Sequence, residues 1–166
     1  MAKKTKINKT NAMRELDTAN IEYEVRTYNP EDYDAHHDLG FQIANSLGED
    51  VESVFKTLVC VTDAGDHVVC CIPVSEELDL KAAAEAAGEK KLTLIPVKDL
   101  LKTTGYIRGG CTPVGMKKKF PTLIEETAQL FDRIVLSGGK PGYQLVVNPL
   151  ELAEFIDAKF CEIVRS

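Results

Sequence analysis

Alternating apolar and polar positions mark several short stretches of the chain, a period of two that is typical of half-buried β-strands. The clearest stretch, residues 21–28, places Ile21, Tyr23 and Val25 on one face and Tyr28 on the opposite, polar face. Two more stretches flank a turn signal at residues 63–66, which predicts an antiparallel hairpin. The predicted strands are residues 21–28, 54–61, 67–72, 91–95, 122–125, 133–136, 143–147 and 160–164.

Apolar positions at helical spacing, together with capping residues, predict helices between these strands. Asp79 and Gly88 stand at the two ends of an alanine-rich segment, and Gly48 stands where a C-terminal cap belongs. Asn148 followed by Pro149 is a typical helix start, because asparagine caps the first turn and proline lacks an N–H that would stay unpaired. The predicted helices are residues 11–20, 39–47, 79–87, 97–102 and 148–157.

The order of about eight strands and five helices is not a regular alternation of strand and helix. It favours a mixed α+β domain with a curved sheet over a doubly wound parallel sheet. A chain of 166 residues is long enough for one substantial core, and no linker or repeat divides it. We therefore expect a flexible basic tail over residues 1–10 and a single domain over residues 11–166.

The charge balance limits the partners of the chain. A net charge of −6 argues against autonomous, tight binding to nucleic acid, and DNA is not an expected partner. Two basic clusters, the lysines of residues 3–9 and residues 117–119, are either solvated surface or weak contacts with a phosphate backbone. No apolar run is long enough for a membrane span, and no secretory signal follows the basic N-terminus. We expect a cytoplasmic protein without a membrane partner.

The five cysteines are not spaced as a disulfide framework or a zinc site, so reduced thiols are expected. They are Cys60, Cys70, Cys71, Cys111 and Cys161. Three of them lie in apolar, strand-like runs, whereas Cys111 lies in a glycine-rich segment. The sequence leaves open whether His36, His37 or His67 lies beside Cys111 as a base.

Two glycine-rich segments are the strongest candidates for a ligand-binding surface. The first glycine loop, residues 104–115, holds four glycines and one proline. Glycine lets a ligand approach backbone N–H groups closely, so the loop could cradle a phosphate, a carboxylate or an oxyanion. The second glycine loop, residues 137–142, could form another wall of donors. In both cases the alternative is a tight structural turn.

Lys56 is the most informative single residue. Its predicted strand is apolar on both faces, which is typical of a central strand. Because an unpaired ammonium group is costly to bury, Lys56 either reaches solvent at the edge of the sheet or points into a polar pocket.

Familiar catalytic signatures do not occur in the chain. The second glycine loop is not a Walker A motif, because Pro141 replaces the residue that would hold magnesium. No metal motif, nucleophile elbow or Ser–His–Asp set is apparent, so neither a metal nor a cofactor is expected. These patterns predict a binding pocket without an obvious catalytic group.

Three motifs, at residues 55–58, 105–115 and 137–139, resemble in order and spacing those of the YbaK/EbsC aminoacyl-tRNA deacylases. This family is related to the editing insertion domain of bacterial prolyl-tRNA synthetases, and the resemblance covers residues 11–164. It implies a single α+β domain whose mixed, mostly antiparallel sheet forms a partly open barrel flanked by helices. The length of the chain is similar to that of free-standing members.

The resemblance implies an enzyme that releases mischarged cysteine from tRNA(Pro). The substrate thiol would attack its own ester carbonyl, so the reaction is formally that of a hydrolase or a lyase. The implied partners are the 3′ acceptor end of aminoacyl-tRNA and prolyl-tRNA synthetase. The competing hypothesis is a non-catalytic module that binds the acceptor end or the synthetase. A third alternative is an amidase or esterase that uses Cys111.

The resemblance also implies site residues. Lys56 matches a lysine that holds the phosphate of the terminal adenosine, and Gly109 and Gly110 complete the implied catalytic set. The implied substrate-binding residues are Tyr28, Thr112, Pro113, Ser137, Gly138 and Gly139. Two positions depart from the family pattern: Thr112 replaces a frequent serine, and Leu39 stands where an aromatic residue is common. The Leu39 departure bears on which amino acid is accepted.

Overall fold

The structure, a computed structural model, describes residues 8–34 and 38–166. In these ranges the chain forms five α-helices, two short 3₁₀ helices and eight strands. The helices are α1 (Asn11–Thr18), α2 (Leu39–Ser46), α3 (Leu80–Ala87), α4 (Val97–Thr104) and α5 (Pro149–Ile156), with η1 (Pro30–Asp32) and η2 (Glu126–Leu130). The strands are β1 (Tyr23–Thr27), β2 (Phe55–Val61), β3 (His67–Pro73), β4 (Thr93–Leu94), β5 (Thr122–Glu125), β6 (Ile134–Ser137), β7 (Tyr143–Val147) and β8 (Lys159–Cys161).

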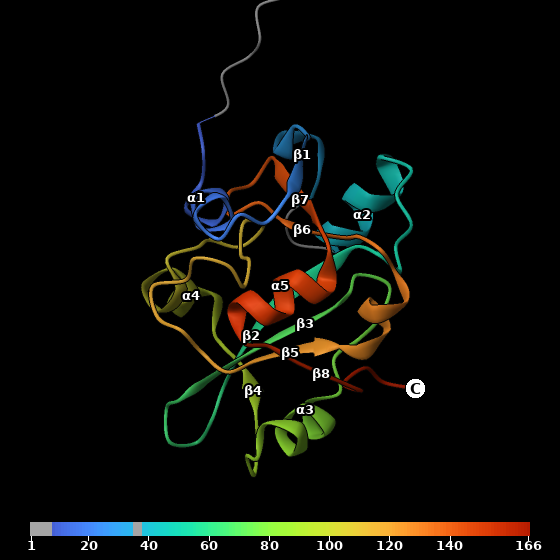
Figure 1. Ribbon diagram of the computed structural model, residues 1–166. Coiled ribbons are helices and arrows are strands. Elements are labelled where there is room, and N and C mark those ends of the chain that lie inside the picture. Colours follow the sequence, from blue (N-terminus) through green and yellow to red (C-terminus); the bar gives the residue numbers. More distant parts are fainter. Residues whose placement is uncertain (1–7, 35–37) are drawn as a thin grey trace, which may run out of the picture.

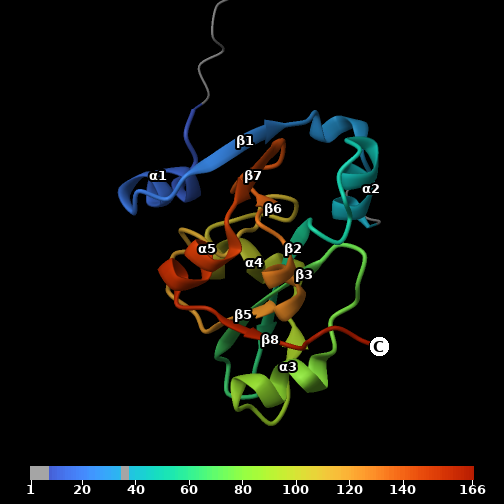
Figure 2. The ribbon, with the colours of Figure 1, turned by 45° about the vertical axis from the view of Figure 1, so that its right-hand side comes forward.

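The strands form two sheets, which confirms the α+β class. The smaller sheet has the order β1-β7-β6 and is entirely antiparallel. The larger sheet has the order β4-β2-β3-β5-β8, and only its β3–β5 and β5–β8 pairs are parallel. A bridge between Val54 and Val135 links the start of β2 to β6, but the sheets do not close into a barrel. Figures 1 and 2 show the smaller sheet with α1 and α2 at one end of the molecule and α3 at the other.

The strand β2 has core on both sides, as its sequence predicted. Phe55 and Val59 belong to the main core with residues of α1, α5 and the smaller sheet. Cys60, on the other face, packs in a second core with Ala83 and Ala84 of α3. Burial of apolar surface on both faces fixes β2 in position, and the polar residues at its N-terminal end are held in a defined place.

The predicted caps form the helix ends. The Asp79 side chain accepts a hydrogen bond from the backbone N–H of Ala82, and Gly88 ends α3 with a φ of 74°. The Asn148 side chain accepts from the N–H groups of residues 150 and 151 at the start of α5. These contacts satisfy backbone groups that a helix end leaves unpaired.

Some predicted boundaries were wrong for identifiable reasons. The strand expected at residues 91–95 is reduced to β4, because β4 lies at the sheet edge and pairs only with the last two residues of β2. The helix α4 runs two residues beyond the predicted end, until Gly105 adopts a φ of 87°. The last strand is β8, and Val164 follows as an isolated bridge to Leu78. No helix in the described part of the chain is long and apolar enough to cross a membrane.

Candidate active site

A cavity of about 290 Å³ lies where α2, the start of β2, the smaller sheet and both glycine loops meet. Tyr28, Lys56, Gly109 and Ser137 line it, and the structure therefore brings these predicted residues together. The rest of the wall is formed by Asp38, Leu39, Gly40, Phe41, Ile43, Val54, Phe55, Thr57, Leu58, Val74, Arg108, Cys111, Leu136, Tyr143 and Gln144. The wall is mainly apolar with a few polar groups, which is typical of a small-molecule site.

Lys56 is held at the cavity by the hairpin of β2 and β3, where it lies opposite Ile72. Its side chain is half-buried, and it lines the cavity together with the neighbouring residues of β2. Within the described ranges, no carboxylate lies within ion-pair distance of its ammonium group. Lys56 therefore lines a mainly apolar cavity and keeps partial exposure, and its ammonium group is available to an anionic ligand.

The first glycine loop is closed by its own hydrogen bonds. The Tyr106 hydroxyl donates to the Val114 carbonyl oxygen at 2.6 Å, and the Gly110 N–H donates to the Ile107 carbonyl oxygen at 2.9 Å. Gly109 has a φ of 87°, and a Cβ there would lie 3.2 Å from Cδ2 of Leu39. The loop is therefore a stiff turn against α2, and the N–H of Gly110 is already used within it.

The second glycine loop is the hairpin between β6 and β7, and it packs against the first. A Cβ on Gly110 would lie 2.9 Å from Cδ of Pro141 and 3.0 Å from Cα of Lys140. The Gly138 N–H donates to the Tyr143 carbonyl oxygen at 2.8 Å, and the Gly139 N–H donates to the Ser137 hydroxyl at 3.4 Å. These two N–H groups therefore form hydrogen bonds within the hairpin, and Ser137 is the residue at the start of this loop that lines the cavity.

Thr112 and Pro113 lie behind the cavity wall. Thr112 is fully buried, and its hydroxyl has no hydrogen-bond partner among the described residues. Pro113 lines a separate pocket with Phe120 and Ile156. The structure therefore does not place Thr112, Pro113, Gly110, Gly138 or Gly139 on the surface of the cavity, although all five belong to the loops that shape it.

Residues just before and at the start of α1 fasten both loops. The Thr10 hydroxyl donates to the Gly138 carbonyl oxygen at 2.6 Å and caps α1 by accepting from the Met13 N–H at 3.3 Å. The Asn11 side chain donates to the Gly115 carbonyl oxygen at 2.7 Å. Residues 8–10 of the predicted tail belong to the described part of the chain, and Thr10 makes the contacts given above. Residues 1–7 lie outside the described ranges.

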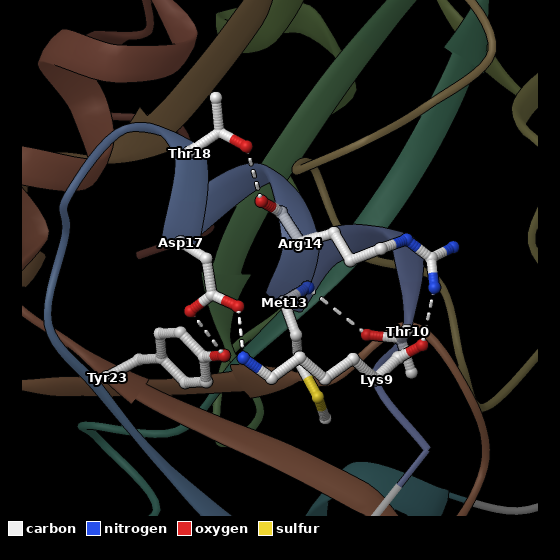
Figure 3. A network of polar contacts seen from close by, with 7 residues as sticks. All are labelled: Lys9, Thr10, Met13, Arg14, Asp17, Thr18 and Tyr23. Atoms are coloured by element: carbon white, nitrogen blue, oxygen red, sulfur yellow. Dashed lines mark hydrogen bonds and ion pairs between the residues drawn. The ribbon is translucent and has the colours of Figure 1, made fainter.

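A polar network holds this segment in place (Figure 3). The Lys9 ammonium group forms an ion pair with Asp17, and the Tyr23 hydroxyl donates to the same carboxylate at 2.9 Å. Hydrogen bonds from Lys9 and Tyr23 lower the pKa of Asp17. The pKa of Tyr23 is raised to about 12, mainly because the hydroxyl is partly desolvated and to a smaller extent because it donates a hydrogen bond to Asp17. The network links the chain before α1 to β1.

Cys111 lines the cavity but has the properties of a protonated thiol. Burial raises its pKa to about 12, and a hydrogen bond from Thr104 acts in the opposite direction. His67 packs edge-on against Phe120, with ring centroids 5.4 Å apart, and does not line the cavity. His36 and His37 lie outside the described residues. A thiol with a pKa near 12 is a poor nucleophile at neutral pH, because the thiolate is the reactive form.

Cys111→Ser is therefore expected to retain most of the activity, within about threefold of the parent, since a protonated thiol contributes little to catalysis. The measurement is the rate of the amino-acid release from tRNA that the sequence resemblance implies, with Cys161→Ser as a control for loss of a cysteine outside the cavity. A loss of about 100-fold or more, with an unchanged urea midpoint, would show that Cys111 acts as a nucleophile.

The sequence did not reveal a polar network beside the cavity. Gln144 lines the cavity from β7, and its side chain contacts Glu49, which is paired with Arg26. The only local signal for this network was Gln144 itself, a polar residue within the otherwise apolar strand β7. Among residues 8–34 and 38–166, no group of three or more His, Cys, Asp or Glu side chains could hold a metal ion.

Comparisons with known proteins agree with this architecture. The model of the aminoacyl-tRNA editing domain family matches residues 41–155. A protein of Enterococcus faecalis (strain ATCC 700802 / V583), described as a proposed Cys-tRNA(Pro)/Cys-tRNA(Cys) deacylase, EbsC, is 42% identical over 163 residues, which is 98% of each chain.

Two solved structures share the fold at low sequence identity. A proposed trans-editing enzyme for prolyl-tRNA synthetase is 21% identical, with a TM-score of 0.79 and coverage of 94% of this chain and 96% of the other. The hypothetical protein APE2540 is 20% identical, with a TM-score of 0.83 and coverage of 94% and 100%. The family model spans most of the chain, and the Enterococcus relative spans nearly all of it; this chain belongs to the aminoacyl-tRNA editing domain family.

Proposed function

We propose that this chain is a free-standing trans-editing deacylase of the cytoplasm that releases mischarged cysteine from tRNA(Pro). The observation that carries the proposal is the position of Lys56. Its ammonium group has no carboxylate partner in the described part of the chain and lines a small cavity beside both glycine loops. The identity of 42% with EbsC, and the name of that relative, support cysteine as the amino acid that is removed.

In this proposal Lys56 holds the phosphate of the terminal adenosine, because an ammonium group at the cavity wall is a natural partner for that anion. Gly109 and Gly110 shape the turn that seats the aminoacyl ester, and Tyr28 and Ser137 contribute further parts of the wall. Thr112, Pro113, Gly138 and Gly139 act from behind it by fixing the two glycine loops.

The cysteine substrate supplies its own nucleophile. Its sulfur forms a bond to the ester carbonyl carbon, the ester C–O bond breaks, and the thiol proton passes to the ribose oxygen. The products are a cyclic thioester, which water then opens, and tRNA with a free terminal hydroxyl. The protein has to orient the substrate and exclude other geometries, which is consistent with a cavity of glycines, aromatic rings and one lysine.

The charge of the chain sets an expectation for binding. Because the net charge is −6, the protein alone is expected to bind tRNA(Pro) with a Kd of about 1 μM or weaker at physiological salt. Addition of prolyl-tRNA synthetase is expected to increase the rate of cysteine release at limiting tRNA. Filter binding and release assays over a series of salt concentrations measure both effects. A nanomolar complex with tRNA alone that survives ~0.5 M salt would contradict this expectation.

Turnover separates the proposed enzyme from a module that only binds the acceptor end. With Cys-tRNA(Pro) in about tenfold excess over protein, an enzyme releases all of the cysteine in repeated cycles. A binding module would instead leave the half-life of the ester unchanged or lengthen it. Release limited to one equivalent of protein, or none, would remove the catalytic proposal.

A further inference from the structure

The side chain of Gln144 presents an unused hydrogen-bond acceptor beside the cavity. Gln144 lies on β7, is only 6% exposed and lines the cavity. Its Nε2 group donates to Oε1 of Glu49 at 3.1 Å. Its own Oε1 atom is buried and has no hydrogen-bond partner among the described residues.

The orientation of this amide is set by an ion pair behind it. Arg26 donates from Nη1 to Oε2 of Glu49 at 2.7 Å, and the Glu49 side chain is only 4% exposed. The two Glu49 oxygens accept hydrogen bonds from Arg26 and from the Gln144 amide nitrogen, and these contacts hold the nitrogen side of the amide toward Glu49. The amide oxygen is thereby turned away from Glu49.

The same three strands fix the position of the amide. Arg26 on β1 and Ser137 on β6 are the direct cross-strand partners of Gln144. Direct partners in an antiparallel sheet project on the same face, so Ser137, Gln144 and Arg26 form one row that leads from the cavity to the ion pair. The Glu49 N–H donates to the Ala44 carbonyl oxygen at 2.9 Å, which ties Glu49 to the end of α2.

A buried acceptor without a donor is unfavourable, and a ligand that brings a donor relieves this cost. The phosphate and the ester carbonyl of an aminoacyl-tRNA end only accept hydrogen bonds, so the donor has to come from the α-ammonium group, the free ribose hydroxyl, the adenine amino group or the cysteine thiol. The α-ammonium group of the amino acid has three N–H donors and a positive charge, and the cavity wall holds Lys56 and Arg108 for the anionic part of the substrate.

We propose that Gln144 recognises the α-ammonium group of the aminoacyl ester through its Oε1 atom, with Glu49 and Arg26 as positioning residues. This inference rests on the proposed deacylase function. With the ammonium group held by Gln144 and the phosphate held by Lys56, the rotation of the amino acid about its ester is restricted.

The test compares two esters on the same tRNA(Pro), cysteinyl and 3-mercaptopropionyl, which differ only in the α-ammonium group. Gln144→Leu is expected to slow enzymatic release of cysteine about 30-fold but to change release of 3-mercaptopropionate less than about threefold, after spontaneous rates are subtracted. Gln129→Leu, at an exposed position of η2, is the matched control and should change neither rate. Equal losses on the two esters in Gln144→Leu would overturn the inference.

A charge-conserving exchange distinguishes recognition from a structural role. In the double variant Gln144→Glu with Glu49→Gln, residue 49 can donate to residue 144, and a carboxylate oxygen is left for the ammonium group. This variant is expected to recover the preference for cysteinyl over 3-mercaptopropionyl ester, whereas Glu49→Ala alone should lose it. Failure of the exchange to recover the preference, with an unchanged urea midpoint, would also overturn the inference.

A binding measurement tests this inference separately from the proposed function. The probe is 3′-cysteinylamino-3′-deoxyadenosine 5′-phosphate, in which an amide replaces the ester, compared with its analogue lacking the α-amine. The parent is expected to bind the amine-containing probe more tightly and Gln144→Leu to bind both alike. Absence of cysteine release by the parent would reject the proposed function, but an amine preference that depends on Gln144 would still support the recognition. The same affinity of the parent for both probes would reject it.

Discussion

Lys56→Ala is expected to slow cysteine release from Cys-tRNA(Pro) by about 100-fold or more, which corresponds to the loss of roughly 3 kcal/mol of transition-state stabilisation. The physical reason is that a charge-assisted contact with the terminal phosphate fixes the ester in the cavity, and Arg108, the other cationic residue on that wall, lies on the first glycine loop rather than on β2. The measurement is the single-turnover rate constant at saturating protein, which separates chemistry from binding.

The fold should tolerate this substitution. The Lys56 side chain is half-buried and has no ion pair in the described part of the chain, so its removal leaves no charge unpaired. The urea midpoint is therefore expected to stay close to that of the parent. Lys91→Ala, an exposed position before β4, is the control for loss of one positive charge. Undiminished release by Lys56→Ala would rule out the role assigned to this lysine.

Replacement of the substrate cysteine by serine is expected to slow release by roughly 100-fold or more, because a hydroxyl is a far weaker internal nucleophile than a thiol. Seryl and cysteinyl esters of the same tRNA(Pro) differ in one atom, so their contacts with the cavity are nearly the same. The comparison uses enzymatic rates after subtraction of each spontaneous rate.

The parent and Cys111→Ser serve together in this experiment. Both proteins are expected to show the same preference for cysteine, because the attacking sulfur belongs to the substrate. Equal rates for the two esters would remove the substrate thiol from the mechanism. If the preference for cysteine disappeared in Cys111→Ser, the nucleophile would be Cys111 of the protein and not the thiol of the substrate.

Much of the fold could be predicted from local patterns. The hairpin of β2 and β3 follows from two apolar runs around a four-residue turn, and the cap residues Asp79 and Asn148 mark helix starts that the structure confirms. The parallel pairing of β3 with β5 could not be predicted, since Val69 and Thr122 come together only through tertiary contacts. Local patterns likewise overestimated the length of β4, because that length depends on where the neighbouring strand β2 ends.

The candidate site was predictable only in part. A charge in an apolar strand and a glycine turn are local signals that singled out Lys56 and the segment of Ser137, but their roles in a site came from the family resemblance; both line the cavity. Thr112 belongs to the same motif as Gly109, but side-chain direction within an irregular loop is set by tertiary contacts, and its hydroxyl is buried. The link from Glu49 to Gln144 joins residues 95 positions apart, so no local pattern could indicate it.

Single-turnover release from Cys-tRNA(Pro) and Pro-tRNA(Pro), at equal tRNA and with protein in excess, tests the proposed editing function most directly. Proline carries no thiol, and an editing enzyme has to spare the correctly charged tRNA. The account predicts release of cysteine at least about 100-fold faster than that of proline after spontaneous hydrolysis is subtracted. Equal release of the two amino acids, or no release of cysteine above the spontaneous rate, would contradict it.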